Sequence, residues 1–468
     1  MTMTSNTEIS LKNFFVYHVS FGQTEGHEEE KVLYFYPRGT KMDVQMKEVG
    51  LSEAIVKFTE TFSSDLCDTL QTQKTKKFFY RPEENIWIIM TVNLPTCLVG
   101  KEKLDGIEYL PNEVQNPVFL AVLRQAYLAA KLFLGPFQRL IDKENGSPDL
   151  LKKKLDFFFT KYLLTLNLKK CDIIDLFQGV QFLPLDKPTF LHAQCFVNLV
   201  EANFPIVQYS VLLFNEQLVW SGLPAEDAQV VYRYLVNSLL PSHSTSSPDG
   251  MRSAVKPNRF ITGPENLTDI NITFSNKVPR VFLSHVLQPG FFYLVVYRIH
   301  QTTLSLLIPG NETIKLDFYR RLDSFLNKRL EKIDSELNEY KEQPSSSGPS
   351  NSSDTLDQDI RFVYFNSMNL ATKSVLDKKR DPGGQSIPKE LLRLLVDVQQ
   401  HQKWLSDCGN SSNETMVKTI SDHWVIGKMS NNRQFYIAVE RKKANLIEIS
   451  DEVRKLCEKQ LKSIFFHV

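Results

Sequence analysis

The sequence predicts an α+β protein made of three domains, each an antiparallel sheet packed with helices. Short apolar strand patterns occur in pairs joined by polar turns, and an amphipathic helical pattern follows each pair. The order strand, strand, helix, two or three strands, helix recurs three times along the 468 residues. Sequence identity between the three stretches is not evident, so the repeat is one of pattern alone.

The first domain is predicted over residues 11–170. Ser52 is the expected N-cap of its first helix, whose inner face would carry apolar residues at the 4-3-4 spacing. Those residues are Leu51, Ile55, Phe58 and Phe62. The expected strands lie at 13–21, 31–36, 77–81, 86–93 and 106–110. Two further helices would cover 119–133, ended by Gly135–Pro136, and 147–166.

The second domain is predicted over residues 205–342 and the third over residues 360–468. A flexible Ser/Pro-rich linker at 343–359 would separate them. In the second domain, strands are expected at 209–214, 218–221, 280–285, 291–299 and 303–308, with one helix at 224–240 and a long one ending near residue 340. In the third domain, strands are expected at 360–366, 423–428, 434–440 and 444–449, with helices at 388–405 and from Ser450 onwards.

Composition excludes several classes of protein. A net charge of +1, with 42% hydrophobic and 23% charged residues, is typical of a globular chain. A nucleic-acid-binding protein or a polybasic membrane anchor would carry a larger positive charge. No apolar run approaches the roughly 20 residues of a membrane span, and no signal peptide is visible. The six cysteines are scattered without a CxxC pair, so we expect a cytosolic protein with reduced thiols.

The sequence lacks the usual motifs of catalysis and cofactor binding. The stretches "VGKE" at 99–102 and "IGKM" at 426–429 lack the upstream glycine and the hydroxyl residue of a phosphate-binding loop. The nine histidines form no HExxH motif and no His/Cys pair at metal spacing, and there is no GxSxG elbow. We therefore predict no cofactor, no metal ion and no catalytic residue.

Two basic clusters and one apolar stretch allow more than one interpretation. Lys152–Lys154 and Arg441–Lys443 are typical of solvated surfaces, although each would also suit a contact with anionic lipid headgroups. The stretch "LFLGPFQRLI" at 132–141 suits a buried helix end, or a contact with lipid or a partner. Pattern and composition thus indicate an interaction protein without identifying its partner.

A set of short motifs occurs in a fixed order along nearly the whole chain. The clearest are "VGLSEAIVKFTETFS" (49–63), "PEENIWIIM" (82–90), "LLFNEQLVWSGL" (212–223), "FVYFNSMNLATKS" (362–374), "DHWVIGK" (422–428) and "ANLIEISDEVRKLC" (444–457). Each motif alone is weakly specific, whereas the set in this order is highly specific. Together the motifs resemble the Ccz family of vacuolar fusion proteins.

The resemblance implies three longin domains and a non-enzymatic role as one subunit of a guanine-nucleotide exchange factor. Members of this family pair with a Mon subunit through longin domains, and the joint surface promotes GDP release from the late-endosomal Rab GTPase, Rab seven. The resemblance also implies a third accessory subunit in animals and peripheral contact with phosphoinositide-containing membranes, and no nucleic acid. The implied location is the cytosol, with recruitment to late endosomes, lysosomes and autophagosomes, where the complex would drive endosome maturation and fusion with lysosomes.

The resemblance places partner and Rab contacts in the first domain, at the level of segments. The candidate residues belong to the helix 50–63 and the strand 77–81: Ser52, Glu53, Val56, Lys57, Glu60, Lys77, Phe79 and Arg81. Lys57 and Glu60 are expected on the side of the helix away from its apolar residues. Two rival hypotheses stay open. The chain could be a tri-longin scaffold without exchange activity, or the exchange subunit of a sister complex that acts on a different GTPase.

Overall fold

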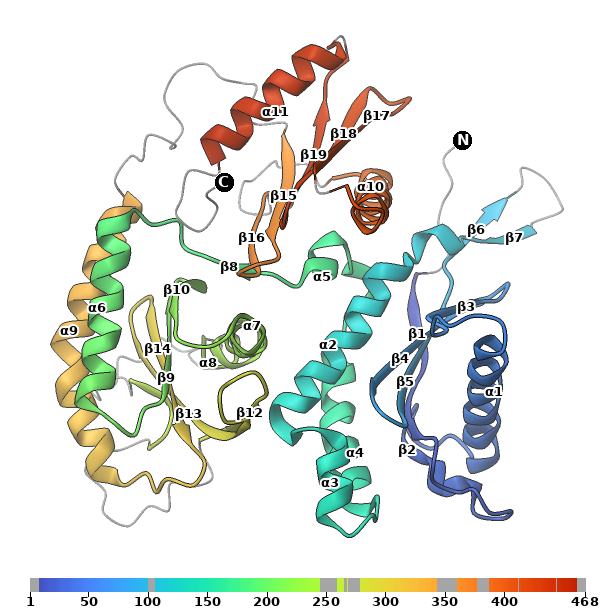
Figure 1. Ribbon diagram of the computed structural model, residues 1–468, viewed down its shortest axis with the longest axis horizontal. Helices are drawn as coiled ribbons and strands as arrows, with labels where there is room; N and C mark the ends of the chain where they lie inside the picture. Colours follow the sequence, from blue (N-terminus) through green and yellow to red (C-terminus); the bar gives the residue numbers. More distant parts are fainter. Residues whose placement is uncertain are drawn as a thin grey trace. The chain divides into compact units, whose positions relative to one another are not determined.

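The computed structural model describes residues 8–99, 106–244, 259–264, 267, 278–342, 360–376, 387–410, 412–442 and 444–460. The predicted linker 343–359 lies outside the described residues. The chain divides into two compact units, residues 1–177 and 178–468, and each is considered by itself (Figure 1). The first unit contains a five-stranded sheet and the second contains two six-stranded sheets. Mixed helices and mainly antiparallel sheets confirm the predicted α+β class.

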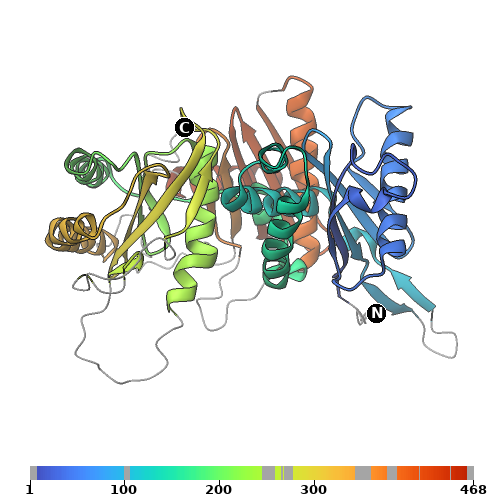
Figure 2. The same ribbon diagram turned by 90° about the horizontal axis from the view of Figure 1, so that it is seen from below.

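The main sheet of the first unit has the strand order β2-β1-β5-β4-β3, and all neighbours are antiparallel. Its strands are β1 (Ser10–His18), β2 (Val32–Tyr36), β3 (Thr69–Gln71), β4 (Thr75–Glu83) and β5 (Ile86–Asn93). Helix α1 (Met42–Glu60) covers one face, and α2 (Asn116–Leu134) and α4 (Asp149–Thr165) cover the other. Figure 2 shows the same layers from below, with α1 in blue on one side of the sheet and α2 and α4 in teal on the other.

Smaller elements complete the first unit. They are the 3-10 turns η1 (Glu28–Lys31), η2 (Pro111–Glu113) and η3 (Leu168–Lys170), and the helices α3 (Phe137–Lys143) and α5 (Ile173–Phe177). A separate two-stranded sheet is formed by β6 (Thr96–Val99) and β7 (Gly106–Tyr109). The strand predicted at 106–110 therefore exists but lies outside the main sheet. The edge strand next to β4 is β3, which is too short to give a strand pattern in the sequence.

Both faces of this sheet are buried, which explains why its strands are continuous apolar runs instead of alternating ones. Phe14 and Phe15 are each fully buried, yet they point to opposite faces because successive strand residues alternate. The ring of Phe14 lies 4.9 Å from that of Phe159 in α4. Phe15 stacks on Phe35 at 5.3 Å and belongs to the core beneath α1.

One described helical stretch, Asn116–Lys143, is long and apolar enough to cross a membrane by length and composition. Its first helix, α2, buries Val118, Phe119 and Leu123 in the domain, and Phe119 stacks on Phe78 of β4 at 5.4 Å. Half of the most apolar 18-residue segment of this stretch is buried inside the structure. Packing against the sheet therefore accounts for the hydropathy of this stretch.

The second sheet has the order β10-β9-β14-β13-β11, and β12 also pairs with β13. Its strands are β9 (Tyr209–Phe214), β10 (Gln217–Ser221), β11 (Phe260–Thr262), β12 (Arg280–Leu283), β13 (Gly290–Ile299) and β14 (Thr302–Pro309). Helices α6 (Lys187–Asn203) and α9 (Leu316–Glu342) share a buried core with the sheet. The helix predicted at 224–240 is α7 (Ala225–Tyr234), which continues as a π-helical turn, η4 (Leu235–Leu239), and α8 (Leu240–Ser244). Helix α6 has no counterpart among the helices predicted from the sequence.

The third sheet has the order β17-β18-β19-β15-β16-β8. Its own strands are β15 (Arg361–Asn366), β16 (Ala371–Ser374), β17 (Ser412–Lys418), β18 (His423–Ser430) and β19 (Arg433–Glu440), with helices α10 (Lys389–Asp407) and α11 (Leu446–Gln460). The strand predicted at 444–449 is wrong, because α11 begins there. Asn445 and Glu448 exchange hydrogen bonds between side chain and backbone amide, at 2.9 and 3.1 Å. This capping box starts the helix before Ser450.

All three sheets share one topology. Leaving aside β8 and β12, each sheet has five strands: the first and last in sequence are neighbours, the second flanks the first, and the third lies at the opposite edge. Strand β8 extends the third sheet beyond β16, and β12 pairs with β13 in the second. A helix connects the second strand to the third: α1, α7 and α10. The repeated pattern in the sequence therefore corresponds to a repeated fold.

A short segment before the second domain also hydrogen-bonds to the third. Strand β8 (Val180–Gln181) pairs in parallel with β16, and the amide of Val180 donates to the carbonyl oxygen of Leu370 at 2.8 Å. The amide of Leu183 donates to the carbonyl oxygen of Leu218 in β10 at 2.9 Å. This segment thus joins the second and third sheets (Figure 1).

Gly179 tests this joint, because a Cβ atom at this position would lie 2.5 Å from the Cβ of Thr372. We expect Gly179→Ala to weaken the joint by about 1–3 kcal/mol, since the segment would have to move away from β16. In a chain with a protease site inserted within 343–359, the cleaved parent should elute from gel filtration as one particle. The cleaved Gly179→Ala protein should separate into two fragments.

Gly222→Ala is the matched control, because the nearest atom to a Cβ there is 3.7 Å away. Its cleaved fragments should stay together. Separation of the cleaved parent itself would contradict the proposed role of β8.

Candidate functional site on the first domain

Helix α1 faces the sheet with a mixture of polar and apolar residues. Its buried residues are Val49, Ser52, Glu53 and Val56. Ser52 is fully buried in the middle of the helix, and its hydroxyl donates to the carbonyl oxygen of Glu48 at 2.8 Å. It is therefore not the N-cap that the sequence predicted, since the helix begins ten residues earlier at Met42.

Buried ion pairs hold the polar residues of this side in place. The Lys77 ammonium on β4 lies 2.9 Å from a carboxylate oxygen of Glu48 and donates to the Ser52 hydroxyl at 3.1 Å. Glu53 is paired with Lys31 at 2.8 Å and with Lys57 at 2.7 Å. Lys77 is only 6% exposed and Glu53 only 8% exposed, so these charges need their partners inside the fold.

The ionisation of Glu53 reflects this arrangement. Burial alone would raise the pKa of the Glu53 carboxyl, but hydrogen bonds and charge from Lys31 and Lys57 outweigh burial and lower the pKa below its ordinary value. The carboxylate is therefore the stable form in the folded domain at neutral pH.

The outward side of α1 is apolar. Val44 is 46% exposed, Leu51 54%, Phe58 65% and Phe62, just beyond the helix, 77%. We call these four residues the α1 outer face. The rings of Phe58 and Phe62 contact each other edge to face with centroids 4.9 Å apart. The prediction that Leu51, Phe58 and Phe62 point inward is wrong, and only Ile55 is partly buried against the core.

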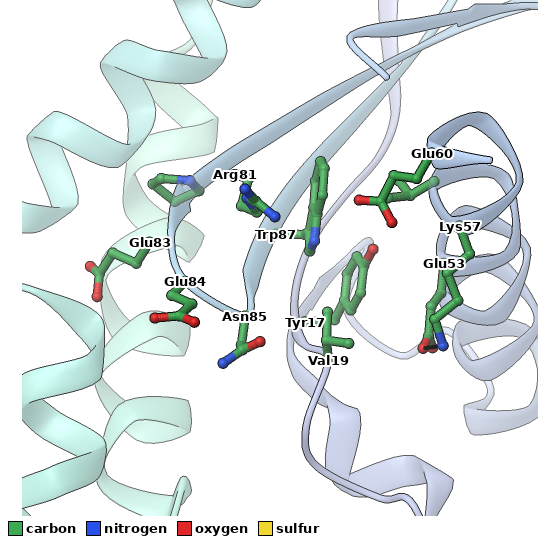
Figure 3. Close-up of a pocket in the computed structure, with 12 residues that line it drawn as sticks. Tyr17, Val19, Glu53, Lys57, Glu60, Arg81, Glu83, Glu84, Asn85 and Trp87 are labelled. Carbon is green, nitrogen blue, oxygen red and sulfur yellow. Dashed lines mark ion pairs between the residues drawn. The ribbon is translucent and has the colours of Figure 1, made fainter. Parts of the chain in front are cut away.

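Beside the second half of α1 lies a pocket of about 520 Å³, which we call the Tyr17 pocket (Figure 3). Its floor is formed by Tyr17, Val56 and Trp87, which are 0%, 5% and 3% exposed. The helix contributes Lys57 and Glu60 to one wall. The end of β4 and the turn to β5 contribute the other wall, which includes Arg81, Pro82, Glu83, Glu84 and Asn85.

The hydroxyl of Tyr17 is buried in this pocket without a hydrogen-bond partner among the described residues. Figure 3 shows it pointing towards Trp87 and Glu60. Burial raises the pKa of Tyr17, and the negative charges of Glu53 and Glu60 raise it further. The hydroxyl therefore stays protonated, and it can both donate and accept a hydrogen bond.

The structure brings five of the eight predicted contact residues together around the Tyr17 pocket. These are Glu53, Val56, Lys57, Glu60 and Arg81. Lys57, Glu60 and Arg81 are exposed. Ser52, Val56, Lys77 and Phe79 are buried between α1 and the sheet, where they support the fold. Tyr17, Trp87 and the turn residues Glu84 and Asn85 were not predicted as site residues, because they come together only through strand pairing and show no distinctive sequence pattern.

Among the described residues, no three His, Cys, Asp or Glu side chains are close enough to hold a metal ion. What the first domain presents to solvent is the exposed α1 outer face and, next to it, a pocket with charged walls.

Comparison with known proteins gives matches along the whole chain. Residues 11–135 match a family model described as the first longin domain of INTU, CCZ1 and HPS4. Residues 207–327 and 357–456 match models described as Intu longin-like domains 2 and 3. The three domains are therefore longin-like, as predicted.

Curated relatives carry the name vacuolar fusion protein CCZ1 homolog. The protein from Nematostella vectensis is 39% identical over 98% of this chain and 98% of its own. The protein from Xenopus tropicalis is 37% identical over 98% of this chain and 97% of its own. A more distant relative from Dictyostelium discoideum is 28% identical, again over 98% of both chains.

Glu53→Gln tests the buried ionic contact. The folded-state pKa of Glu53 lies below its ordinary value of 4.5, so the carboxylate stabilises the fold above that pH. This stabilisation is lost as the pH falls through the folded-state pKa. We expect Glu53→Gln to destabilise the first domain by about 1–3 kcal/mol at pH 7. The difference in unfolding free energy between the variant and the parent should narrow as the pH falls towards 4. Calorimetry of the full chain at both pH values measures this.

Glu60→Gln serves as the control, because this exposed carboxylate on the same helix takes part in no ion pair described in the structure. It should leave the unfolding temperature unchanged. An equal loss of stability in both variants would contradict the ionic role of Glu53. So would a destabilisation by Glu53→Gln that does not depend on pH.

Proposed function

The chain belongs to the CCZ1 family of vacuolar fusion proteins, and on that basis we propose that it is one subunit of a guanine-nucleotide exchange factor. With a Mon subunit, it would promote GDP release from the late-endosomal Rab GTPase, Rab seven. Family membership supports a role in vacuolar and endosomal fusion. The exchange activity, its GTPase and the partner subunit are our proposal.

The observation that carries the proposal is the exposed α1 outer face. A single domain that leaves Leu51, Phe58 and Phe62 more than half exposed has an apolar surface of the kind that marks protein interfaces. Aromatic side chains are enriched at such interfaces because they bury a large area with few rotatable bonds. We propose that this face is covered when the first domain pairs with the Mon subunit and the GTPase.

Exchange by surface binding also agrees with the absence of a recognisable catalytic motif. Speeding GDP release about a thousandfold requires roughly 4 kcal/mol of preferential binding to the nucleotide-free GTPase. An interface of standard size, about 800 Å² per partner, can provide this without a nucleophile or a general base. In this scheme the protein acts by deforming the nucleotide site of the GTPase.

The proposed activity predicts that GDP release needs both subunits. We would measure release of fluorescent GDP from the late-endosomal Rab with this chain alone, with the Mon subunit alone, and with both co-expressed. Only the co-expressed pair should accelerate release strongly, because each chain alone presents part of the docking surface. A stable pair without acceleration would favour the scaffold hypothesis, and acceleration of a different GTPase would favour a sister-complex role.

The α1 outer face predicts a second result. The double variant Leu51→Ser/Phe58→Ser should reduce the release rate of the pair at least about tenfold, because single interface anchors commonly contribute 1–2 kcal/mol or more. Its folding should be unaffected, since both side chains are exposed.

The matched control is Phe157→Ser/Leu164→Ser on α4. These side chains are 68% and 78% exposed, and α4 covers the other face of the same sheet. This control should release GDP at the parental rate. If the two double variants lose activity equally, the α1 outer face is not the specific contact.

A further inference from the structure

The Tyr17 pocket has an apolar floor with one unsatisfied polar atom. Val19, Val56 and Trp87 line it with carbon atoms. The hydroxyl of Tyr17 has no partner among the described residues, and Tyr17 itself is 0% exposed. A buried hydroxyl without a hydrogen bond is costly, and buried polar groups in native proteins almost always have a partner. The pocket therefore suits a ligand that combines a carbon chain with a polar end.

The charges around the pocket favour a positively charged end. Its lining includes four carboxylates, from Glu53, Glu60, Glu83 and Glu84, and two cationic side chains. One of these cations, Lys57, is already paired with Glu53 at 2.7 Å. The other, Arg81, lies over the ring of Trp87 with its guanidinium carbon 5.8 Å from the ring centroid.

Two of the carboxylates are committed within the fold. Glu53 is paired with lysines, and Glu83 points away from the pocket (Figure 3). The Glu83 carboxylate accepts hydrogen bonds from the Tyr127 hydroxyl at 2.7 Å and from the amides of Phe137 and Gln138 at 2.7 and 2.8 Å. Glu60 and Glu84 stand exposed at the mouth, on the helix and on the turn. They are the carboxylates that a ligand can reach.

Negative charge also acts at the floor of the pocket. Burial is the main cause of the raised pKa of Tyr17, and the negative charges of Glu53 and Glu60 raise it further, so both carboxylates act at the hydroxyl. An anion would meet this field unfavourably. A cation would be stabilised by it, and the neutral hydroxyl can accept a hydrogen bond from an ammonium or guanidinium group.

We propose that the Tyr17 pocket binds a lysine or arginine side chain of a partner protein in the assembly. The carbon stem of that side chain lies against Val56 and Trp87, and its charged end lies between the Tyr17 hydroxyl and the Glu60 carboxylate. Only the identity of the partner rests on the proposed exchange function. The capacity of the pocket to bind a cationic side chain does not.

The test uses the full chain labelled with 5-fluorotryptophan. The chain has four tryptophans, and one of them is Trp87 in the pocket floor. The fluorine resonance of Trp87 is assigned by its loss in Trp87→Phe. The probes are the acetyl methylamides of arginine and lysine, compared with those of citrulline and glutamate. Citrulline has nearly the shape of arginine without its charge.

We expect a saturable shift of the Trp87 resonance with the arginine and lysine probes, half-complete at about millimolar concentration, as suits ligands of this size. The citrulline probe should bind at least about fivefold more weakly. Glu60→Gln should weaken arginine binding about threefold or more, because it removes charge without removing volume. Asp43→Asn, a charge loss at the other end of α1, should have no effect.

Three results would overturn the proposal. They are no saturable shift of Trp87, an equal response to arginine and citrulline, and stronger binding of the glutamate probe, which would make the pocket an anion site. A second arm uses the chain co-purified with the Mon subunit and the nucleotide-free GTPase. There the Trp87 resonance should be shifted and should no longer respond to the arginine probe.

The second arm separates a protein side chain from a free small molecule as the natural occupant. If Trp87 in the assembly titrates as it does in the isolated chain, the pocket is open and a side chain of these partners does not fill it. Failure of the exchange activity would be seen separately, in the GDP-release assay. A chain that binds the arginine probe but does not accelerate release would refute the proposed function and not the cation pocket.

Discussion

The buried ionic contact between α1 and its sheet determines what the first domain presents to solvent. Lys77 reaches Glu48 at 2.9 Å and Lys31 reaches Glu53 at 2.8 Å, both largely shielded from water. Rotating the helix to bury Leu51, Phe58 and Phe62 would gain about 1.5–3 kcal/mol for each side chain. It would also leave Lys77 and Lys31 inside the domain without partners, at a cost of several kcal/mol. The ion pairs therefore add little net stability but fix which side of the helix faces outward.

Two features of the first domain follow from this orientation. Val44, Leu51, Phe58 and Phe62 form the exposed α1 outer face. The Tyr17 pocket lies beside the second half of the helix, where Glu53, Lys57 and Glu60 line it. The corresponding helices of the other domains are oriented in the usual way. In α7, Ala228 and Val231 are buried, and in α10, Leu391 and Leu395 are buried. The same strand order thus supports a packed scaffold in two domains and an exposed apolar helix in the first.

This difference also explains how far the sequence could predict the structure. Periodicity correctly located most strands and the long helices, because apolar patterns and local turns determine them. It nevertheless placed Leu51 and Phe58 inward, which is wrong. The periodic signal on α1 is real, but it shows only that one side is apolar. Which side faces the sheet depends on Lys31 and Lys77, whose pairing with Glu53 and Glu48 requires the tertiary fold and leaves no local pattern.

The candidate site could be predicted as a segment and not residue by residue, for the same reason. Five of the eight proposed contact residues line one pocket, whereas Ser52, Lys77 and Phe79 lie in the interior. Glu60 stands at the mouth of that pocket, two residues after Phe58 on the outer face. A partner that covers Phe58 therefore comes close enough to place a side chain beside Glu60. Apolar contact and charge recognition would then be coupled through one helix, whose position is held by the ion pairs beneath it.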